Sequence, residues 1–355
     1  MHSNCYMKYY DKIDGLRFVA IFLVLAAHFT GLSNFIYIAY YGVDLFFVIS
    51  GFLITTILLK PNNSSFKHNY KNFIGRRTLR IFPIYYLTIL ILWLLNFPFV
   101  RLRLIWLLTY TMNYQIVYMD FDHVGHFWSL CVEEQFYLVW PFIVLSFKNK
   151  KAILTAIIIA IILIGYAQLI FNIFPALSIY NYFGLLTRMS SLGLGALGAV
   201  LAAQNLLPEK LFRNKLFECF MLVVLGFSLS FNYIVREPIL NLCSFYLVVK
   251  AANYDFSLTA INTFLRNKKI IHIGTLAYGI YIFHLPIKYY LTPYVFNPIW
   301  LSINFKALGI FKFMRWQSWI IKFPLYSFLS FLLASISYKY IETPFLKLKD
   351  KYFKY

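Results

Sequence analysis

The first apolar segment of the sequence, DGLRFVAIFLVLAAHF, carries two side chains that could do chemistry, Arg17 and His28. Their separation amounts to three helical turns plus about 20°, so both lie on one face of a helix. A rise of roughly 16 Å would put Arg17 near a membrane surface and His28 deep in the bilayer. A snorkelling anchor would also explain Arg17, and an interhelical hydrogen bond would explain His28. A neutral buried imidazole is a good general base, so proton abstraction is the chemistry that this pair favours.

A second group of candidates is the run of basic residues in GRRTLRIFPIYY. Arg76 and Arg80 share a helix face because they are one turn apart, and Arg77 lies beside them. Guanidinium groups pair bidentately with phosphate, so the run is a candidate clamp for a phosphate-rich ligand on the cytoplasmic side. The preference of membrane proteins for basic cytoplasmic loops explains the same residues without a ligand.

The third group lies in GHFWSLCVEEQFYLVWP, where two adjacent carboxylates interrupt an apolar segment. Ser129, Glu133 and Tyr137 recur at every fourth position and form one polar stripe on a helix, whereas Glu134 points about 100° away. Charged side chains in membrane spans usually mark function, so we predict an interior role for Glu133, such as orienting or charging a histidine. Glu134 equally suits a structural place at the membrane interface, and a proton or ion path is a competing role for such carboxylates.

Three further polar positions are weaker candidates, for substrate contact or for structural pairing: Asp44, Arg188 and His284. The glycines that follow Arg188, at Gly193, Gly195 and Gly198, indicate close packing of helices more than a nucleotide-binding loop. The four cysteines have no short spacing, so we expect no disulfide framework and no thiolate metal site.

The scaffold that must position these side chains is indicated by the composition. Of 355 residues, 61% are hydrophobic and only 13% are charged, whereas soluble domains carry about 25% charged residues. Apolar runs near 20 residues long supply roughly ten membrane spans. We predict them at 16–32, 43–59, 82–99, 128–147, 152–172, 184–203, 216–233, 237–250, 273–291 and 320–341. Two other apolar segments, 103–119 and 294–311, are broken by polar residues or proline, which is typical of re-entrant or interfacial pieces.

The formal net charge of +20 is distributed as membrane topology requires. With the N-terminus inside, the cytoplasmic segments hold 23 of the 33 Lys and Arg residues, and the opposite loops hold 7. No continuous basic face is left for a nucleic-acid duplex. We therefore predict an all-α, polytopic integral membrane bundle of about ten helices with both termini cytoplasmic. It would form a single domain over residues 1–355, with no appended soluble domain.

Taken together, these motifs resemble those of the acyltransferase-3 family of membrane-bound O-acyltransferases. DGLRFVAIFLVLAAHF is similar to the Arg-x10-His signature that opens the sequences of this family. The remaining family blocks resemble, in the same order, FFVISGFLI, RRTLRIFPIYY, WSLCVEEQFYLVWP, IGTLAYGIYIFHLP and YKYIETPF. The match extends from Asp14 to about Phe345, which is essentially the whole chain, and six blocks in order are a specific signal.

The resemblance implies a helical membrane enzyme that O-acylates carbohydrates, with acetyl-CoA as the usual acyl donor. We expect no metal cofactor. The resemblance would make His28 the catalytic histidine and Arg17 its essential partner. It would also place Arg77 and Arg80 in a cytoplasmic RxxR-type motif close to the CoA phosphates. Glu133 matches the acid of the family's WSLxxE block.

On this basis we expect the CoA phosphates to bind near Arg17 and the three arginines of the basic run, with the thioester reaching His28. His28, supported by Glu133, would deprotonate a sugar hydroxyl or accept the acetyl group briefly. The acceptor would be a cell-surface or lipid-linked glycan, such as lipopolysaccharide O-antigen, and the chain would lie among the lipids of a bacterial inner membrane. A transporter or flippase of a lipid-linked or anionic sugar would use the same buried Arg, His and Glu.

Overall fold

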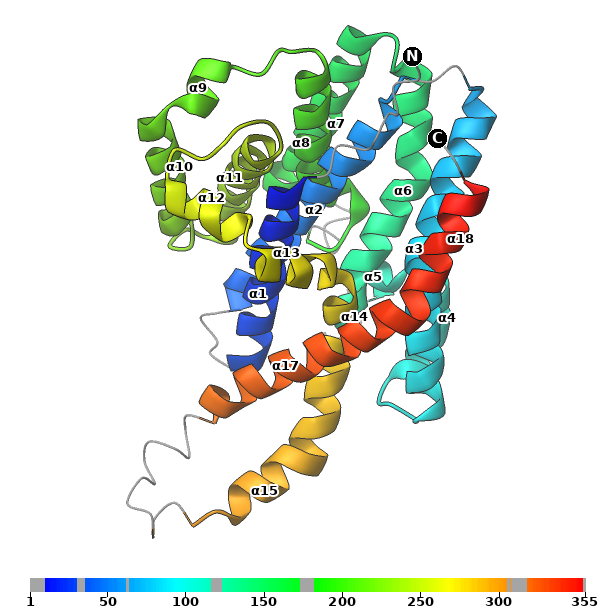
Figure 1. Cartoon of the computed structure of the whole chain (residues 1–355), viewed down its shortest axis with the longest axis vertical. Coiled ribbons are helices and arrows are strands. Elements are labelled where there is room, and N and C mark those ends of the chain that lie inside the picture. Colours follow the sequence, from blue (N-terminus) through cyan, green and yellow to red (C-terminus); the bar gives the residue numbers. More distant parts are fainter. Residues whose placement is uncertain are drawn as a thin grey trace.

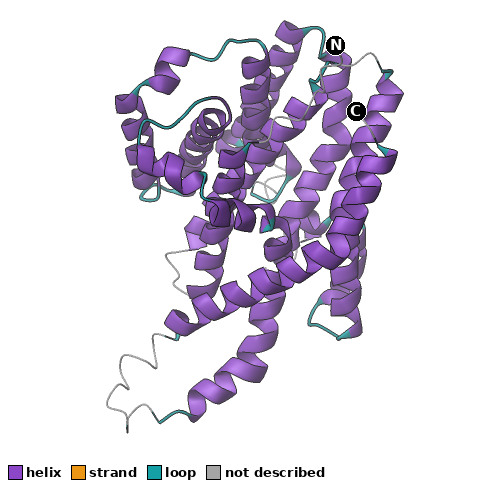
Figure 2. Cartoon of the chain, viewed as in Figure 1, coloured by secondary structure: helices purple, strands orange, loops and turns teal. Residues whose placement is uncertain are grey.

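The computed structural model describes residues 10–30, 36–61, 64–115, 123–172, 182–304, 307 and 318–353. Within these ranges the chain consists of helices joined by short loops and contains no strand (Figure 2). The predicted all-α class is therefore confirmed. Cys5 and parts of the segments 103–119 and 294–311 lie outside the described residues.

The longer helices are α1 (Asp11–Thr30), α2 (Ile36–Leu58), α3 (Phe66–Leu94), α6 (Trp128–Phe147), α7 (Lys151–Phe171), α8 (Leu185–Ala203), α11 (Tyr233–Asn253), α14 (Ala277–Leu291) and α17 (Trp319–Ser337). The shorter ones are α4 (Val100–Leu108), α5 (Met112–Gln115), α9 (Glu209–Arg213), α10 (Lys215–Ser228), α12 (Thr259–Leu265), α13 (Lys268–Thr275), α15 (Asn297–Ser302) and α18 (Thr343–Tyr352). A 3₁₀ turn (Gly125–Phe127) precedes α6, and π-helical turns follow α14 (Thr292–Phe296) and α17 (Tyr338–Glu342). In Figure 1, α9 to α12 gather on one side, and α3, α4 and α18 lie on the other.

Seven of the described helices are long and apolar enough to cross a membrane, and the bent pair of α13 with α14 and its continuation makes eight. The protein is thus a multi-pass membrane protein, as predicted. Helices overlap all ten predicted spans, but α10 has 14 residues and rises about 21 Å, less than the bilayer core. Helix α11 contains three charged residues, Arg236, Glu237 and Lys250, and is therefore not an uninterrupted apolar span.

The basic run lies inside a helix that begins well before the predicted span 82–99. Helix α3 starts at Phe66, and the side chain of Ser65 caps it by accepting a hydrogen bond from the His68 amide at 3.3 Å. An apolar run marks only the part of a helix that is buried in lipid, so hydropathy places the start of α3 too late. As a result, Arg76, Arg77 and Arg80 project from a rigid element and not from a loop.

Close helix packing centres on the glycines of α2 and α8. A Cβ atom added to Gly51 would lie 1.9 Å from the Leu192 carbonyl oxygen, and one added to Gly195 would lie 2.0 Å from the Val48 carbonyl oxygen. The two backbones are therefore in direct contact, as small residues permit in membranes. Gly193 and Gly198 face side chains of α7 and α11. The prediction that these glycines serve helix packing is confirmed.

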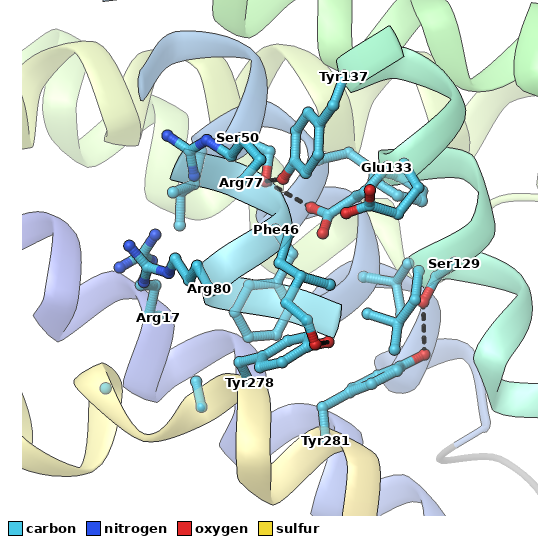
Figure 3. A pocket seen from close by; sticks show the side chains of 18 of the residues that line it. Arg17, Phe46, Ser50, Arg77, Arg80, Ser129, Glu133, Tyr137, Tyr278 and Tyr281 are labelled. Carbon is cyan, nitrogen blue, oxygen red and sulfur yellow. Dashed lines mark hydrogen bonds between the residues drawn. The ribbon is translucent and has the colours of Figure 1, made fainter. Parts of the chain in front are cut away.

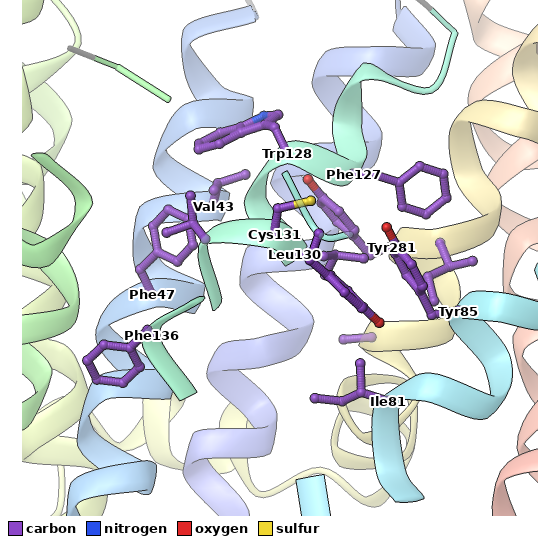
Figure 4. Packing of buried hydrophobic residues seen from close by; sticks show 14 of the residues in the cluster. Val43, Phe47, Ile81, Tyr85, Phe127, Trp128, Leu130, Cys131, Phe136 and Tyr281 are labelled. Atoms are coloured by element: carbon purple, nitrogen blue, oxygen red, sulfur yellow. The ribbon is translucent and has the colours of Figure 1, made fainter. Parts of the chain in front are cut away.

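The start of α1 is held in the same way by the segment from α12 to α13. A Cβ at Gly15 would lie 2.5 Å from the Leu265 carbonyl oxygen, and a Cβ at Gly274 would lie 1.9 Å from that of Asp14. These contacts fix the turn of α1 that bears Arg17. A hydrophobic cluster joins α2, α3, α6 and α14 further along, where Figure 4 shows Phe47, Tyr85 and Tyr281 around α6.

A test of the α2–α8 contact compares one substitution at two glycines. Gly195→Ala forces its methyl group into the backbone of α2, and we expect a loss of about 1–3 kcal/mol in stability, as for an overpacked core. In Gly226→Ala the added methyl group has no described atom within 4 Å. Because the substitution also removes a flexible residue from a helix, it should be neutral or should stabilise the protein by up to about 1 kcal/mol. The measurement is the melting temperature of both purified variants in detergent. Equal melting temperatures would contradict the backbone contact.

Candidate active site

A cavity of about 100 Å³ lies between α1, α2, α3, α6 and the bend from α13 to α14 (Figure 3). Its polar lining comes from residues that the sequence singled out and from several that it did not: Arg17, Ser50, Arg77, Arg80, Ser129, Glu133, Glu134, Tyr137, Thr275, Tyr278 and Tyr281. Apolar side chains of α2, including Phe46 and Phe47, close the remaining wall. The cavity is thus the place where the three motifs of the sequence meet.

Three guanidinium groups occupy one side of this cavity. Arg17 is paired with Asp14 one turn earlier, at 2.9 Å. Arg77 lies over the Tyr137 ring, 5.6 Å from its centroid, and both Arg17 and Arg77 repel the charge of Arg80. Neither Arg77 nor Arg80 has a described carboxylate within 4.0 Å of its guanidinium. Asp14, Glu133 and Glu134 are near enough to interact with these charges, but none of them forms an ion pair with Arg77 or Arg80, so both guanidinium groups can still donate to an anion.

Arg76 faces away from the cavity, although it was predicted with the other arginines. It donates to Asp350 at 3.0 Å and to the Phe353 carbonyl oxygen at 2.5 Å. The Phe353 ring lies directly on Gly75, and a larger residue there would displace the ring. These contacts attach α18 to α3, so the described partners of Arg76 are those of a structural residue.

The two acids of α6 both reach the cavity. Glu133 accepts a hydrogen bond of 2.5 Å from Ser50, whose oxygen also lies 3.5 Å from the Tyr137 hydroxyl. Glu134 is buried, and its Oε1 atom has no hydrogen-bond partner among the described residues. Glu134 therefore points into the bundle and not towards lipid. The helical wheel separated the two acids, but the cavity is wide enough to include both.

On the opposite side from the arginines, Ser129 and Tyr281 close the cavity (Figure 3). Their hydroxyl oxygens are 2.7 Å apart, and the Tyr281 hydroxyl also donates to the His126 carbonyl oxygen at 2.9 Å. Sequence reasoning included Ser129 but missed Tyr281. Its position one turn before His284 in IGTLAYGIYIFHLP was the available signal.

His28 lies beyond Tyr281 and is not part of the cavity wall. Its Nδ1 atom is 3.2 Å from Nε2 of His284, and the His284 ring lies 5.1 Å from that of His126, measured between centroids. His28 is half-buried, whereas the other two histidines are fully buried. The described hydrogen bonds thus join His28 to His284 and Glu133 to Ser50. No three His, Cys, Asp or Glu side chains in the described residues are placed to hold a metal ion.

Asp44 and Arg188 belong to a separate buried cluster, in which neither residue lines the cavity. The Arg188 guanidinium lies 2.6 Å from Asp44 and 2.5 Å from Glu237, and it packs 4.3 Å above the Tyr182 ring. These side chains tie α2, α8 and α11 together. Sequence reasoning missed Glu237 because Glu237 follows Arg236 directly, and two adjacent charged residues are typical of the polar end of a helix.

The arrangement suits a ligand with an anionic end and a reactive end. The anionic end would meet Arg17, Arg77 and Arg80, and the reactive end would lie near Tyr281. Beyond that point His28 offers an imidazole that can accept a proton. The described contacts therefore connect the cavity wall at Tyr281 to His28 through the ring of His284.

Comparison with known proteins shows which proteins this chain resembles. The model of the acyltransferase domain matches residues 10–339. Putative peptidoglycan O-acetyltransferase YrhL of Bacillus subtilis is 29% identical over 97% of this chain and 56% of its own length. O-acetyltransferase OatA of Staphylococcus aureus is 25% identical over 98% of this chain and 59% of its own, and peptidoglycan O-acetyltransferase OatA of Listeria monocytogenes is 29% identical over 96% and 56%. The chain therefore spans somewhat more than half the length of these relatives. No solved structure matches.

The buried cluster yields a stability prediction. Arg188→Met would leave two carboxylates unpaired in the bundle interior, and we expect it to cost about 3–5 kcal/mol. Arg213→Met is the matched control, because Arg213 pairs with Glu209 at the surface with 68% of its side chain exposed; surface pairs contribute only about 0–1 kcal/mol. Thermal unfolding in detergent compares the two variants. Similar melting temperatures would show that Arg188 is not structural.

Proposed function

This chain belongs to the acyltransferase-3 family, and on that premise we propose that it is a membrane O-acetyltransferase that modifies a cell-surface glycan. The observation that carries the proposal is the cavity that joins three arginines on one side to the wall before His28 on the other. A transporter or flippase would need the same polar groups, but the relatives' names all describe O-acetyltransferases.

The donor proposed for the cavity is acetyl-CoA, bound from the cytoplasmic side. Its phosphates would lie against Arg17, Arg77 and Arg80, of which Arg77 and Arg80 form no ion pair with a described carboxylate. The pantetheine arm would pass along the apolar wall of α2 and bring the thioester towards Tyr281. Burial of the thioester beside Phe46 and Phe47 would keep water away from it.

His28 is proposed to act as a general base on the acceptor. Its imidazole would take the proton of a sugar hydroxyl while the hydroxyl oxygen attacks the thioester carbonyl. The new C–O bond forms as the C–S bond breaks, and the proton passes from His28 to the departing CoA thiolate. A brief acetyl-histidine is the alternative route with the same balance. In either route, Glu133 and Ser50 would position the donor from the cavity side.

The acceptor proposed first is peptidoglycan, because the names of two of these relatives specify it. Lipopolysaccharide O-antigen, the acceptor that the sequence suggested, is the second candidate, since both are glycans with free hydroxyl groups. We place the chain in the inner membrane of a bacterium, and either acceptor is assembled on the outer side of that membrane. His28 is half-buried, so a polymer could approach it from the surface of the bundle.

The first test measures O-acetyl groups on isolated peptidoglycan and surface polysaccharide by proton NMR. A strain without its own copy of the gene would carry the wild type, His28→Ala, or the exposed control His272→Ala, at matched membrane levels. We expect acetyl signals with the wild type and with His272→Ala, and none with His28→Ala. The glycan that gains the signals identifies the acceptor. Full acetylation with His28→Ala would refute the role of His28, and no acetylation by the wild type would refute the transferase.

A second test compares the effects of substituting two arginines of the basic run. Arg80→Gln removes a charged donor from the cavity, and we expect KM for acetyl-CoA to rise about 10- to 100-fold, as for a lost hydrogen bond to a charged group. Arg76→Gln should leave KM nearly unchanged, because Arg76 is engaged with Asp350. Steady-state kinetics with varied acetyl-CoA provide the measurement. An equal effect of both substitutions would argue against the proposed donor site.

A further inference from the structure

We propose that His284 is a positioning residue that holds His28 in the tautomer with its proton on Nδ1, which leaves Nε2 free as the base. The inference deepens the proposed function and rests on it, because it assumes that His28 is the group that takes the proton. His284 itself does not line the cavity and is fully buried. Its effect would therefore be exerted through His28.

The first step concerns the proton on His284. Its Nδ1 atom lies 2.6 Å from the backbone carbonyl oxygen of Tyr281. A carbonyl oxygen only accepts, so Nδ1 must carry a proton and donate it. The opposite orientation of the ring would put a carbon atom at this distance, which is well inside van der Waals contact. The position and protonation of this nitrogen are therefore both fixed by the backbone of α14.

The second step concerns the other nitrogen of the same ring. The described contacts of His284 are with His28, His126, Phe29 and Tyr281, and none of these partners is a carboxylate. Burial without an acid favours the neutral imidazole. A neutral ring with its proton on Nδ1 has a lone pair on Nε2. Nε2 of His284 is therefore an acceptor.

The third step follows from the contact between the two rings. Nε2 of His284 is 3.2 Å from Nδ1 of His28. Because the first atom accepts, the second must donate, and the proton of neutral His28 lies on Nδ1. The ring of His28 also hydrogen-bonds to the backbone of Val24. A neutral ring has a single N–H group, so the Nδ1 proton serves both contacts and Nε2 is unprotonated. When it takes a proton from the acceptor hydroxyl, the positive charge formed is stabilised through the same hydrogen bond.

The sequence of α14 explains why this arrangement is rigid. Pro286 has no amide hydrogen, so the carbonyl oxygen of Ile282 loses its helical partner. His126 fills that place with its Nε2 atom at 3.3 Å, while the Tyr281 hydroxyl donates to the His126 carbonyl oxygen. The two bonds lock the start of α6 to α14 on either side of His284. A neutral orienting residue also avoids a buried carboxylate in the membrane, which would be costly.

The experiment uses the full-length protein in detergent, with ¹⁵N-labelled histidine. In the wild type we expect the nitrogen chemical shifts of His28, assigned by comparison with His28→Ala, to show a protonated Nδ1 and an unprotonated Nε2. His284→Leu removes the acceptor, so His28 should sample both tautomers and kcat should fall about 100-fold with little change in KM, as for other lost orienting groups. His284→Gln keeps an acceptor oxygen and should restore most of kcat. His272→Gln is the surface control.

The outcomes distinguish this inference from the proposed function. A wild-type His28 with its proton on Nε2, or with both nitrogens protonated, overturns the inference whether or not the protein transfers acetyl groups. The expected tautomer with unchanged kcat in a folded His284→Leu variant overturns the positioning role. An equal loss of kcat in His284→Gln and His284→Leu also overturns the positioning role. Such a result would indicate that His284 relays a proton, because neither Gln nor Leu can do so. If the proposed function alone is wrong, the expected tautomer of His28 would still be observed, because the NMR measurement does not require the protein to catalyse a reaction.

Discussion

An ionised side chain inside this bundle persists only where other polar groups compensate its charge, because neither lipid nor apolar side chains can do so. Arg188 is held between two carboxylates, and Lys250 lies 2.5 Å from Glu218. Arg77 and Arg80 form no direct ion pair with a described carboxylate, and they face a cavity that Glu133 and Glu134 also line. The pattern of pairing therefore separates the charges that build the fold from those left for a ligand. Both the helix packing and the candidate site follow from that division.

Much of this arrangement could be predicted from local features of the sequence. Long apolar runs specify membrane helices wherever they occur, and the spacing of Arg17 and His28 depends only on helical geometry. Ser129, Glu133 and Tyr137 were predicted to form one stripe, and all three line the cavity. The fold class and the polar stripe on α6 are thus properties of short segments. The orientation of the termini across the membrane stays a prediction.

The features that could not be predicted depend on contacts between distant segments. Arg76 and Arg80 are equivalent on a helical wheel, and only the packing of α18 directs Arg76 away from the cavity. His126 and Tyr281 look like ordinary polar residues until Pro286 frees a carbonyl oxygen between them. An interfacial place stayed open for Glu134 because a wheel shows direction but not the width of a cavity. Each error comes from treating one helix in isolation.

The bent segment from α13 to α14 touches α1 at two levels. Gly274 meets the backbone at Asp14, next to Arg17, and His284 meets His28 near the other end of the helix. One inserted residue in α1 would rotate everything beyond it by about 100° and advance it by about 1.5 Å. Only one of the two contacts could then survive. The number of residues between the arginine and the histidine is consequently fixed by the distance between the two contacts that α13 and α14 make. Helix α1 would therefore tolerate replacement of its lipid-facing residues far better than an insertion or a deletion.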